Sequence, residues 1–217
     1  MNVDRLLEKY FKTSEQPVSI EVFDSDSIFG VYSDIVKLLN SHSEIELGVL
    51  QALSYCFYEV LDNVLTHSGK ICGTVLLRYL KADNVIQILV ADDGIGVQKS
   101  LSQNPKFRDV SEEEALALCL NDTVTDGKGM GFGLYSTARL IHNAGIRLDI
   151  HSGNSVLSYD GISTVVKNSD FWQGTIVYFE IHSNREIDPN DVVDGRTDCA
   201  EQFNETFIQD GDIDDLW

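Results

Sequence analysis

The sequence predicts an α+β fold, a two-layer α/β sandwich in which a mixed sheet carries helices on one face. Short apolar runs rich in β-branched residues recur along the chain and are typical of strands. Longer stretches carry apolar residues at helical spacing. Because the strands follow one another with helices before and between them, we expect an α+β arrangement.

The first half of the chain predicts three strands and two helices. The first strand follows Pro17, and the longest helix ends at Ser68-Gly69, a pair suited to a helix C-terminus. Two β-rich runs are separated by Lys81-Ala82-Asp83-Asn84, which indicates a hairpin. The expected elements are a strand at 18–23, helices at 27–39 and 46–67, and strands at 74–80 and 85–91.

The second half begins with a polar stretch, residues 97–128, that is long for a loop. Ser111 and Glu114 form a capping-box pattern ahead of ALALCL, which predicts a short helix inside this stretch. A helix at 133–144, capped by Gly145, then precedes strands expected at 146–151 and 175–181.

Composition and charge exclude several classes of protein. A chain of 217 residues fits one domain, and its net charge of −19 repels a nucleic-acid backbone and an anionic membrane. No signal sequence is apparent, and no apolar stretch approaches the roughly 18 residues of a membrane span. Four cysteines without CxxC or disulfide-like spacing suit a reducing compartment, so we expect a cytoplasmic protein.

The acidity is concentrated at the C-terminus. Residues 183–217 contain eleven acidic residues against two arginines, a net charge of −9, and lack a sustained apolar period. We therefore expect a domain at residues 1–182 followed by an acidic tail at 183–217 that is mobile or weakly docked.

Polar residues interrupt the apolar helix expected at 46–67. Glu59, Asn63 and His67 are spaced i, i+4, i+8 and share one face, with Asp62 and Thr66 beside them. A solvent-facing stripe explains the pattern equally well, but the polar face is narrow and its flanks are apolar, which favours a site. The opposite arc carries Leu53, Phe57, Val60, Leu61, Val64 and Leu65.

Two glycine-rich stretches follow this helix. In VIQILVADDGIGV an apolar strand runs into Asp92, and Gly94 and Gly96 permit a sharp turn or close approach of a ligand; a plain turn is an equal alternative. In DGKGMGFGL, glycines alternate at 127, 129, 131 and 133 before a helix, where backbone N–H groups suit phosphate. The spacing fits neither a Walker A loop nor a GxGxxG fingerprint.

In this order, the stretches resemble the GHKL superfamily, the ATP-binding module shared by sensor histidine kinases, anti-sigma-factor serine kinases, type II topoisomerases and the heat-shock chaperone ATPase. Glu59 and Asn63 match its N box, and Asp92-x-Gly94-x-Gly96 matches its first glycine box. The second glycine box is matched by Gly129-x-Gly131-x-Gly133-Leu134, and the late Gly-Thr element by Gly174-Thr175. The resemblance covers about residues 45–182 and implies a Bergerat-type fold.

The resemblance implies a site for ATP and Mg²⁺. Asn63 would coordinate the Mg²⁺, Glu59 would be the catalytic general base, and Asp92 would accept the adenine amino hydrogen with support from Thr175. Gly94 and Gly96 would let the adenine lie close, and residues 97–128 would form the lid over the nucleotide. The remaining nucleotide-binding residues implied are Lys128, for which a solvated lysine is an equal alternative, and Gly129, Gly131, Gly133 and Leu134.

The resemblance does not extend to a complete histidine kinase. The residues ahead of position 46 are too few for a phosphoacceptor hairpin and a first strand, and His42 lacks the usual context. The chain instead resembles stand-alone bacterial modules, which implies ATP hydrolysis or phosphate transfer to a partner Ser or Thr in a regulatory switch. The alternative is an ATP-gated protein-binding module with little or no turnover. A regulatory protein partner is implied, and a homodimer is left open.

Overall fold

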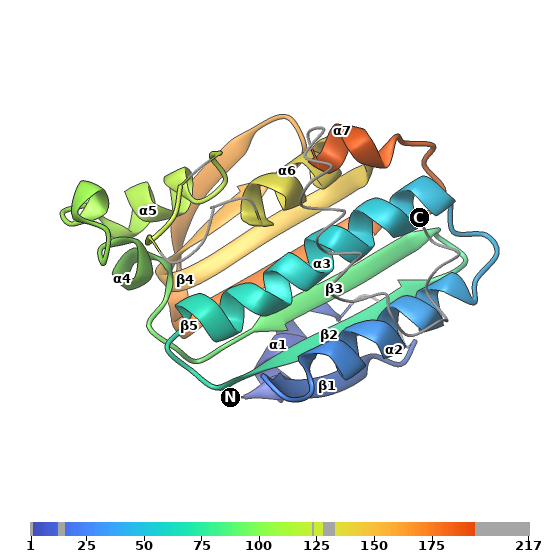
Figure 1. The fold of residues 1–217 in the computed structure, drawn as a ribbon, viewed down its shortest axis with the longest axis horizontal. Coiled ribbons are helices and arrows are strands. Elements are labelled where there is room, and N and C mark those ends of the chain that lie inside the picture. Colours follow the sequence, from blue (N-terminus) through green and yellow to red (C-terminus); the bar gives the residue numbers. More distant parts are fainter. Residues whose placement is uncertain (1, 13–15, 123, 128–132, 194–217) are drawn as a thin grey trace.

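The structure is a computed structural model, and it describes residues 2–12, 16–122, 124–127 and 133–193. Within these residues one five-stranded sheet has the order β1-β2-β3-β5-β4 (Figure 1). The strands are β1 (Ser19–Asp24), β2 (Cys72–Leu80), β3 (Val85–Ala91), β4 (Gly145–Tyr159) and β5 (Thr164–His182).

The long helices lie on one face of the sheet, where the middle one, α3, runs roughly along the strands between the other two (Figure 1). These helices are α2 (Ile28–Asn40), α3 (Leu47–His67) and α6 (Gly133–Ala144), and the short α7 (Pro189–Val193) packs beside α6 and α3. The predicted α+β fold and the predicted helices and strands are confirmed, with ends that differ by a few residues in most cases.

The expected mixed sheet is wrong, because every neighbouring pair of strands runs antiparallel. The long connection between β3 and β4 makes these two strands parallel to each other, as a crossover does. However, β5 returns from β4 through a hairpin and inserts between them, so β3 and β4 are not neighbours.

The expectation that helices cover only one face is also wrong. The helix α1 (Val3–Tyr10), which the sequence pattern did not reveal, packs on the opposite face. Its Leu6 and Tyr10 form a second core with residues such as Leu89 and Tyr178 of the sheet. Burial on both faces is the reason that β3 is apolar at every position except Gln87 and does not alternate.

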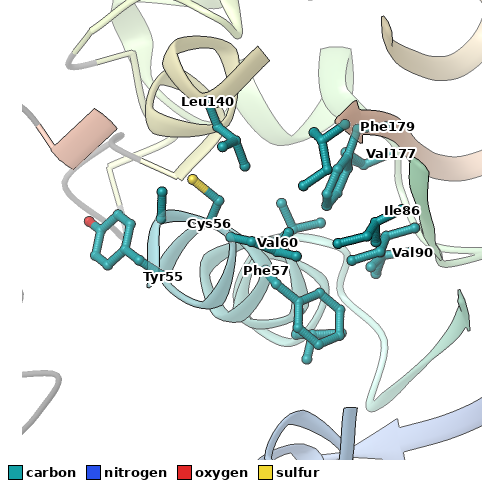
Figure 2. Close-up of a cluster of buried hydrophobic side chains, with 14 of the residues drawn as sticks. Tyr55, Cys56, Phe57, Val60, Ile86, Val90, Leu140, Val177 and Phe179 are labelled. Carbon is teal, nitrogen blue, oxygen red and sulfur yellow. The ribbon is translucent and has the colours of Figure 1, made fainter. Parts of the chain in front are cut away.

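The main core lies between the sheet and the helices. Figure 2 shows Val60 of α3 facing Val90 of β3 and Phe179 of β5, with Phe57 of α3 and Leu140 of α6 in the same cluster. All of these side chains are buried. This packing holds the apolar side of α3 against the sheet. The polar residues of α3, Glu59 and Asn63, therefore lie on the side of the helix that faces away from the core.

Two local signals in the sequence are confirmed in detail. The predicted hairpin joins β2 to β3, and Asn84 adopts a positive φ of 55° in its turn. Ser111 and Glu114 form the predicted capping box, in which each side chain accepts a backbone N–H of the other residue. This box begins α5 (Glu112–Leu118), which follows α4 (Val97–Leu101) and a 3₁₀ turn at Pro105–Phe107 in the lid segment, residues 97–128.

The boundary expected at residue 182 differs from the structure. Ser183 continues the contacts of the domain, because its N–H donates to the Asn84 carbonyl at 2.8 Å. The helix α7 then places Val192 and Val193 in the main core. Residues 194–217, the rest of the predicted acidic tail, lie outside the described residues.

None of the helices in the described ranges combines the length and apolar character that crossing a membrane requires.

Candidate nucleotide site

The polar face of α3 lies beside the first turn of α6. Leu53, Phe57 and Val60 bury the apolar arc of α3 in the main core. Glu59 and Asn63 remain only partly buried on the other side. The polar side chains of α3 thus face α6 as well as solvent.

Gly133, the first residue of α6, sits against Glu59 and Asn63. A Cβ atom at position 133 would stand 3.0 Å from Asn63 Nδ2 and 3.1 Å from Glu59 Oε2. Contacts this short leave little room for a side chain, so glycine permits α6 to begin here. The first turn of a helix carries backbone N–H groups without helical partners and a partial positive charge. The carboxyl and the amide therefore share one space with an anion-attracting helix end.

The environment of Glu59 changes its acidity. Burial, with a smaller contribution from the neighbouring negative charge of Asp62, raises the pKa of the Glu59 carboxyl to about 7. Asp62 itself is exposed and accepts a hydrogen bond from the Thr66 hydroxyl at 3.1 Å. At neutral pH, Glu59 therefore exchanges a proton readily, as a general acid or base does.

Asp92 lies directly after β3 and is almost completely buried, with 3% of its surface exposed. Its Oδ1 accepts the Gly94 N–H at 2.7 Å. Burial raises the pKa of Asp92 to about 6, against the lowering effect of the hydrogen bonds at Gly94 and Thr175. A carboxyl held in so apolar a place at the end of a strand is a candidate for recognising a ligand.

Residues of β5 also contact Asp92. The Asp92 N–H donates to the Thr175 carbonyl at 2.9 Å, and the Trp172 indole N–H donates to the Asp92 carbonyl at 3.1 Å. A Cβ atom at Gly174, where φ is +94°, would stand 2.5 Å from Asp92 Oδ1. Only glycine fits at position 174, both for its φ and for the closeness of the carboxyl.

The glycines of the DDGIG stretch have structural reasons of their own. A Cβ atom at Gly94 would stand 2.2 Å from the Ser68 carbonyl oxygen, which also accepts the Ile95 N–H at 2.8 Å. Gly96 has a φ of +80°, and a Cβ there would stand 2.6 Å from the Ser152 hydroxyl. The turn is thus bound closely to the end of α3 and to β4, whether or not a ligand approaches it.

The predicted site residues fall into two groups within the described residues. Glu59, Asn63 and Gly133 meet at one end, and Leu134 packs against the main core next to them. Asp92, Gly94, Gly96 and Thr175 meet at the other end, and Ser68 joins this group to α3. Lys128, Gly129 and Gly131 lie outside the described residues.

Ser152 and Trp172 lie beside Gly174 and Asp92, but the sequence did not indicate either residue. The Ser152 hydroxyl accepts the Val97 N–H at 3.0 Å and donates to the Gly174 carbonyl at 2.9 Å, which joins the lid segment to β5. Neither residue lies in a motif. Their positions depend on the irregular pairing of β4 with β5 around Ser152 and Gly153, which only the folded hairpin specifies.

A pocket of about 520 Å³ lies elsewhere, on the other side of α6, where Tyr135, Arg139 and His142 line it. It contains none of the residues of the two groups. The candidate site rests instead on the short contacts and hydrogen bonds described above.

Comparison with known families agrees with this geometry. The family described as histidine kinase-, DNA gyrase B-, and HSP90-like ATPase matches residues 48–185. The matched region runs from α3 through β5 and contains the N box, both glycine boxes and Gly174-Thr175. A comparison with curated proteins found no match. Because the family match covers more than half of the 217 residues, the chain belongs to the histidine kinase-, DNA gyrase B- and HSP90-like ATPases and carries an ATP-binding domain of the GHKL type.

Proposed function

We propose that this domain binds ATP together with Mg²⁺ and either hydrolyses it or transfers its γ-phosphate to a Ser or Thr of a partner protein, in a regulatory switch. The proposal rests on the close approach of Glu59 and Asn63 to Gly133 at the start of α6. Phosphoryl transfer depends on positioning and on charge stabilisation. A carboxyl that exchanges protons near neutral pH, an amide and a helix N-terminus supply those functions in one place.

The residues present fit a Mg²⁺ ion shared with the nucleotide. Among the residues that the structure describes, no three His, Cys, Asp or Glu side chains gather to form a metal site. Mg²⁺ is commonly held by one or two protein oxygens together with water and phosphate oxygens. The Asn63 amide oxygen is the protein ligand that we propose, and bound Mg²⁺ would neutralise phosphate charge.

Glu59 is the proposed general base. Its carboxylate would take the proton of the attacking water or hydroxyl group and hold it while the phosphoryl group moves. A base works best when its pKa lies near the working pH, and the pKa of about 7 meets this condition. Gly133 keeps side-chain atoms out of the space beside this carboxylate.

Asn63→Ala is expected to weaken Mg-ATP binding at least about tenfold while changing metal-free ADP binding little, because only the metal-dependent part uses the amide oxygen. Isothermal titration calorimetry with Mg²⁺ and with a chelator measures both. Asn40→Ala, at the exposed end of α2, is the matched control and should bind as the wild type does. A variant that keeps the full magnesium enhancement would remove Asn63 from the metal site.

Phosphate release tests the proposed function directly. Purified protein with Mg-ATP labelled in the γ-phosphate is expected to release phosphate or to label a protein in an extract of the source cells. Phosphoamino-acid analysis should find acid-stable phosphoserine or phosphothreonine. Acid-labile phosphate on any of the five histidines of this chain would contradict our expectation that it is not a histidine kinase.

An ATP-gated binding module is the second candidate, and the helices in the described part of the lid segment favour it. The helix α5 packs on the β4–β5 hairpin, and Glu112 accepts the Asn154 N–H at 3.1 Å. Such a preformed surface is suited to a partner protein. If Mg-ATP binds but neither phosphate release nor transfer is measured, the binding module replaces the enzyme.

A further inference from the structure

Asp126 is a buried carboxylate near the start of the second glycine box. Only 1% of its side chain is exposed, and two side chains from separate helices reach the same carboxylate oxygen. His67 Nδ1 lies 2.9 Å from Asp126 Oδ2, and the Ser100 hydroxyl donates to this oxygen at 3.0 Å. Neither the N box nor the glycine boxes assign a role to these three residues.

The three residues come from the parts of the chain that surround the proposed phosphate site. His67 ends α3, one turn after Asn63. Ser100 lies in α4, at the beginning of the lid segment, and Asp126 lies at its end, next to Gly127. One carboxylate thus connects both ends of the lid segment to the N-box helix.

Two neighbouring hydrogen bonds hold the same part of the lid segment. The Asn104 side-chain amide donates to the Thr125 carbonyl at 3.0 Å, and the Gly127 N–H donates to the Thr125 hydroxyl at 3.2 Å. Two side chains, Ser100 and Asn104, therefore join the beginning of the lid segment to its end. Gly127 is the last described residue before the second glycine box, and the described structure resumes at Gly133, beside Glu59.

The burial of Asp126 makes its partners necessary. A carboxylate taken out of water costs free energy unless donors compensate for the lost hydration. His67 meets this need with an N–H on Nδ1, since a carboxylate oxygen accepts and does not donate. Loss of the donor at position 67 would remove part of this compensation and the link between the end of the lid segment and α3.

We propose that Asp126, held by His67 and Ser100, is a positioning residue for the nucleotide phosphates. This group, which we call the Asp126 clasp, fixes Asp126 and Gly127, the last described residues before the second glycine box. The inference rests on the proposed function in that the glycine box contacts phosphate. Asp126 acts through that segment and not on the nucleotide itself, and the adenine contact at Asp92 is independent of it.

Asp126→Asn and His67→Leu are expected to weaken binding of a non-hydrolysable ATP analogue about 10- to 100-fold, the effect of losing one hydrogen bond to a charged group. Binding of adenosine, which has no phosphate, should change less than about threefold, within the spread of such measurements. The ratio of the two dissociation constants, measured by calorimetry on the full chain, separates phosphate positioning from general loss of folding.

A conservative variant tests the hydrogen bond itself. In His67→Asn the side-chain amide N–H lies close to the place of the imidazole Nδ1–H, so this variant should retain most of the affinity that His67→Leu loses. Asp109→Asn neutralises an exposed carboxylate of the same lid segment and is the matched control. Asp109→Asn should leave both dissociation constants unchanged.

Amide hydrogen exchange without nucleotide gives a second, independent result. Asp126→Asn should speed exchange in α4 and at residues 124–127 at least about tenfold and leave β2 and β3 unchanged. Equal weakening of the ATP analogue and adenosine, equal behaviour of His67→Leu and His67→Asn, or unchanged exchange in α4 would each overturn the clasp. Absent turnover would overturn the proposed enzyme but not the clasp, because neither measurement depends on turnover.

Discussion

Asp92→Asn is expected to abolish adenine-nucleotide binding while leaving the domain folded. The Asp92 Oδ1 atom is already engaged by the Gly94 N–H at 2.7 Å. The second carboxylate oxygen would then accept the adenine amino hydrogen. In the variant, the amide oxygen keeps the Gly94 bond and the amide N–H₂ takes the other position, so a donor faces a donor. A buried polar pair that cannot bond costs about 1–3 kcal/mol, besides the contact that is lost.

The same substitution is expected to stabilise the nucleotide-free domain at neutral pH. The pKa of Asp92 is raised from its ordinary value of 3.8 to about 6, mainly by burial. Well below pH 3.8 the carboxyl is protonated in both the folded and unfolded states and carries no penalty. Above pH 6 the folded state must hold a buried charge, so the stability of the wild type falls as pH rises between these values. Asparagine does not titrate, so its advantage at pH 7 relative to pH 4 should be on the order of 2 kcal/mol.

Calorimetric titration with ATP and GTP measures the binding, and urea unfolding at pH 4 and pH 7 measures the stability. Asp93→Asn is the matched control, because Asp93 is exposed and forms an ion pair with Lys70 at 3.2 Å. It should bind ATP as the wild type does. Equal affinity of the wild type for ATP and GTP, or normal ATP affinity of Asp92→Asn, would remove Asp92 from adenine recognition.

Glu59→Gln is expected to lower turnover about 10²–10⁴-fold and to leave Mg-ATP affinity almost unchanged, because a general base acts on the attacking group in the transition state. Glutamine keeps the volume of the side chain beside Gly133 but offers no basic oxygen. The variant should therefore accumulate the ATP-bound form and prolong any ATP-dependent partner complex.

The pH dependence gives a second measure of the same group. Glu59 is a base only when ionised, so turnover should rise with pH and level off above its pKa of about 7. Because the charge of Asp62 raises the pKa of Glu59, Asp62→Asn should move this rise to lower pH while keeping turnover above it. Phosphate release between pH 5 and 9 measures both curves. If the wild type turns ATP over and Glu59→Gln keeps the rate, Glu59 is not the base.

Much of the fold was predictable because its signals are local. The helix α3 follows from the spacing of its apolar residues, the β2–β3 hairpin from a short polar turn, and α5 from the Ser111–Glu114 capping box. Each signal depends on contacts within a few residues along the chain, so it is encoded in the order of side chains alone. The two carboxyl groups of the candidate site, Glu59 and Asp92, were recognisable for the same reason.

Other features depend on residues that are distant in the sequence. The helix α1 buries its apolar side chains only against the second face of the sheet, where Leu6 and Tyr10 pack with Tyr178. The antiparallel order arises because β5 inserts between β3 and β4, which no local pattern specifies. The expected helices on one face and the expected mixed sheet were wrong for this reason.

By itself, the sequence determined which residues are polar on a buried helix and where glycines interrupt the chain. Only the tertiary structure decided what those residues meet. It set Gly133 against Glu59 and Asn63, buried Asp92 under Trp172 and Gly174, and closed Asp126 onto His67 and Ser100. The physical reason is that burial and hydrogen bonding, which alter pKa values and exclude side chains, are properties of the packed neighbourhood and not of the chain order.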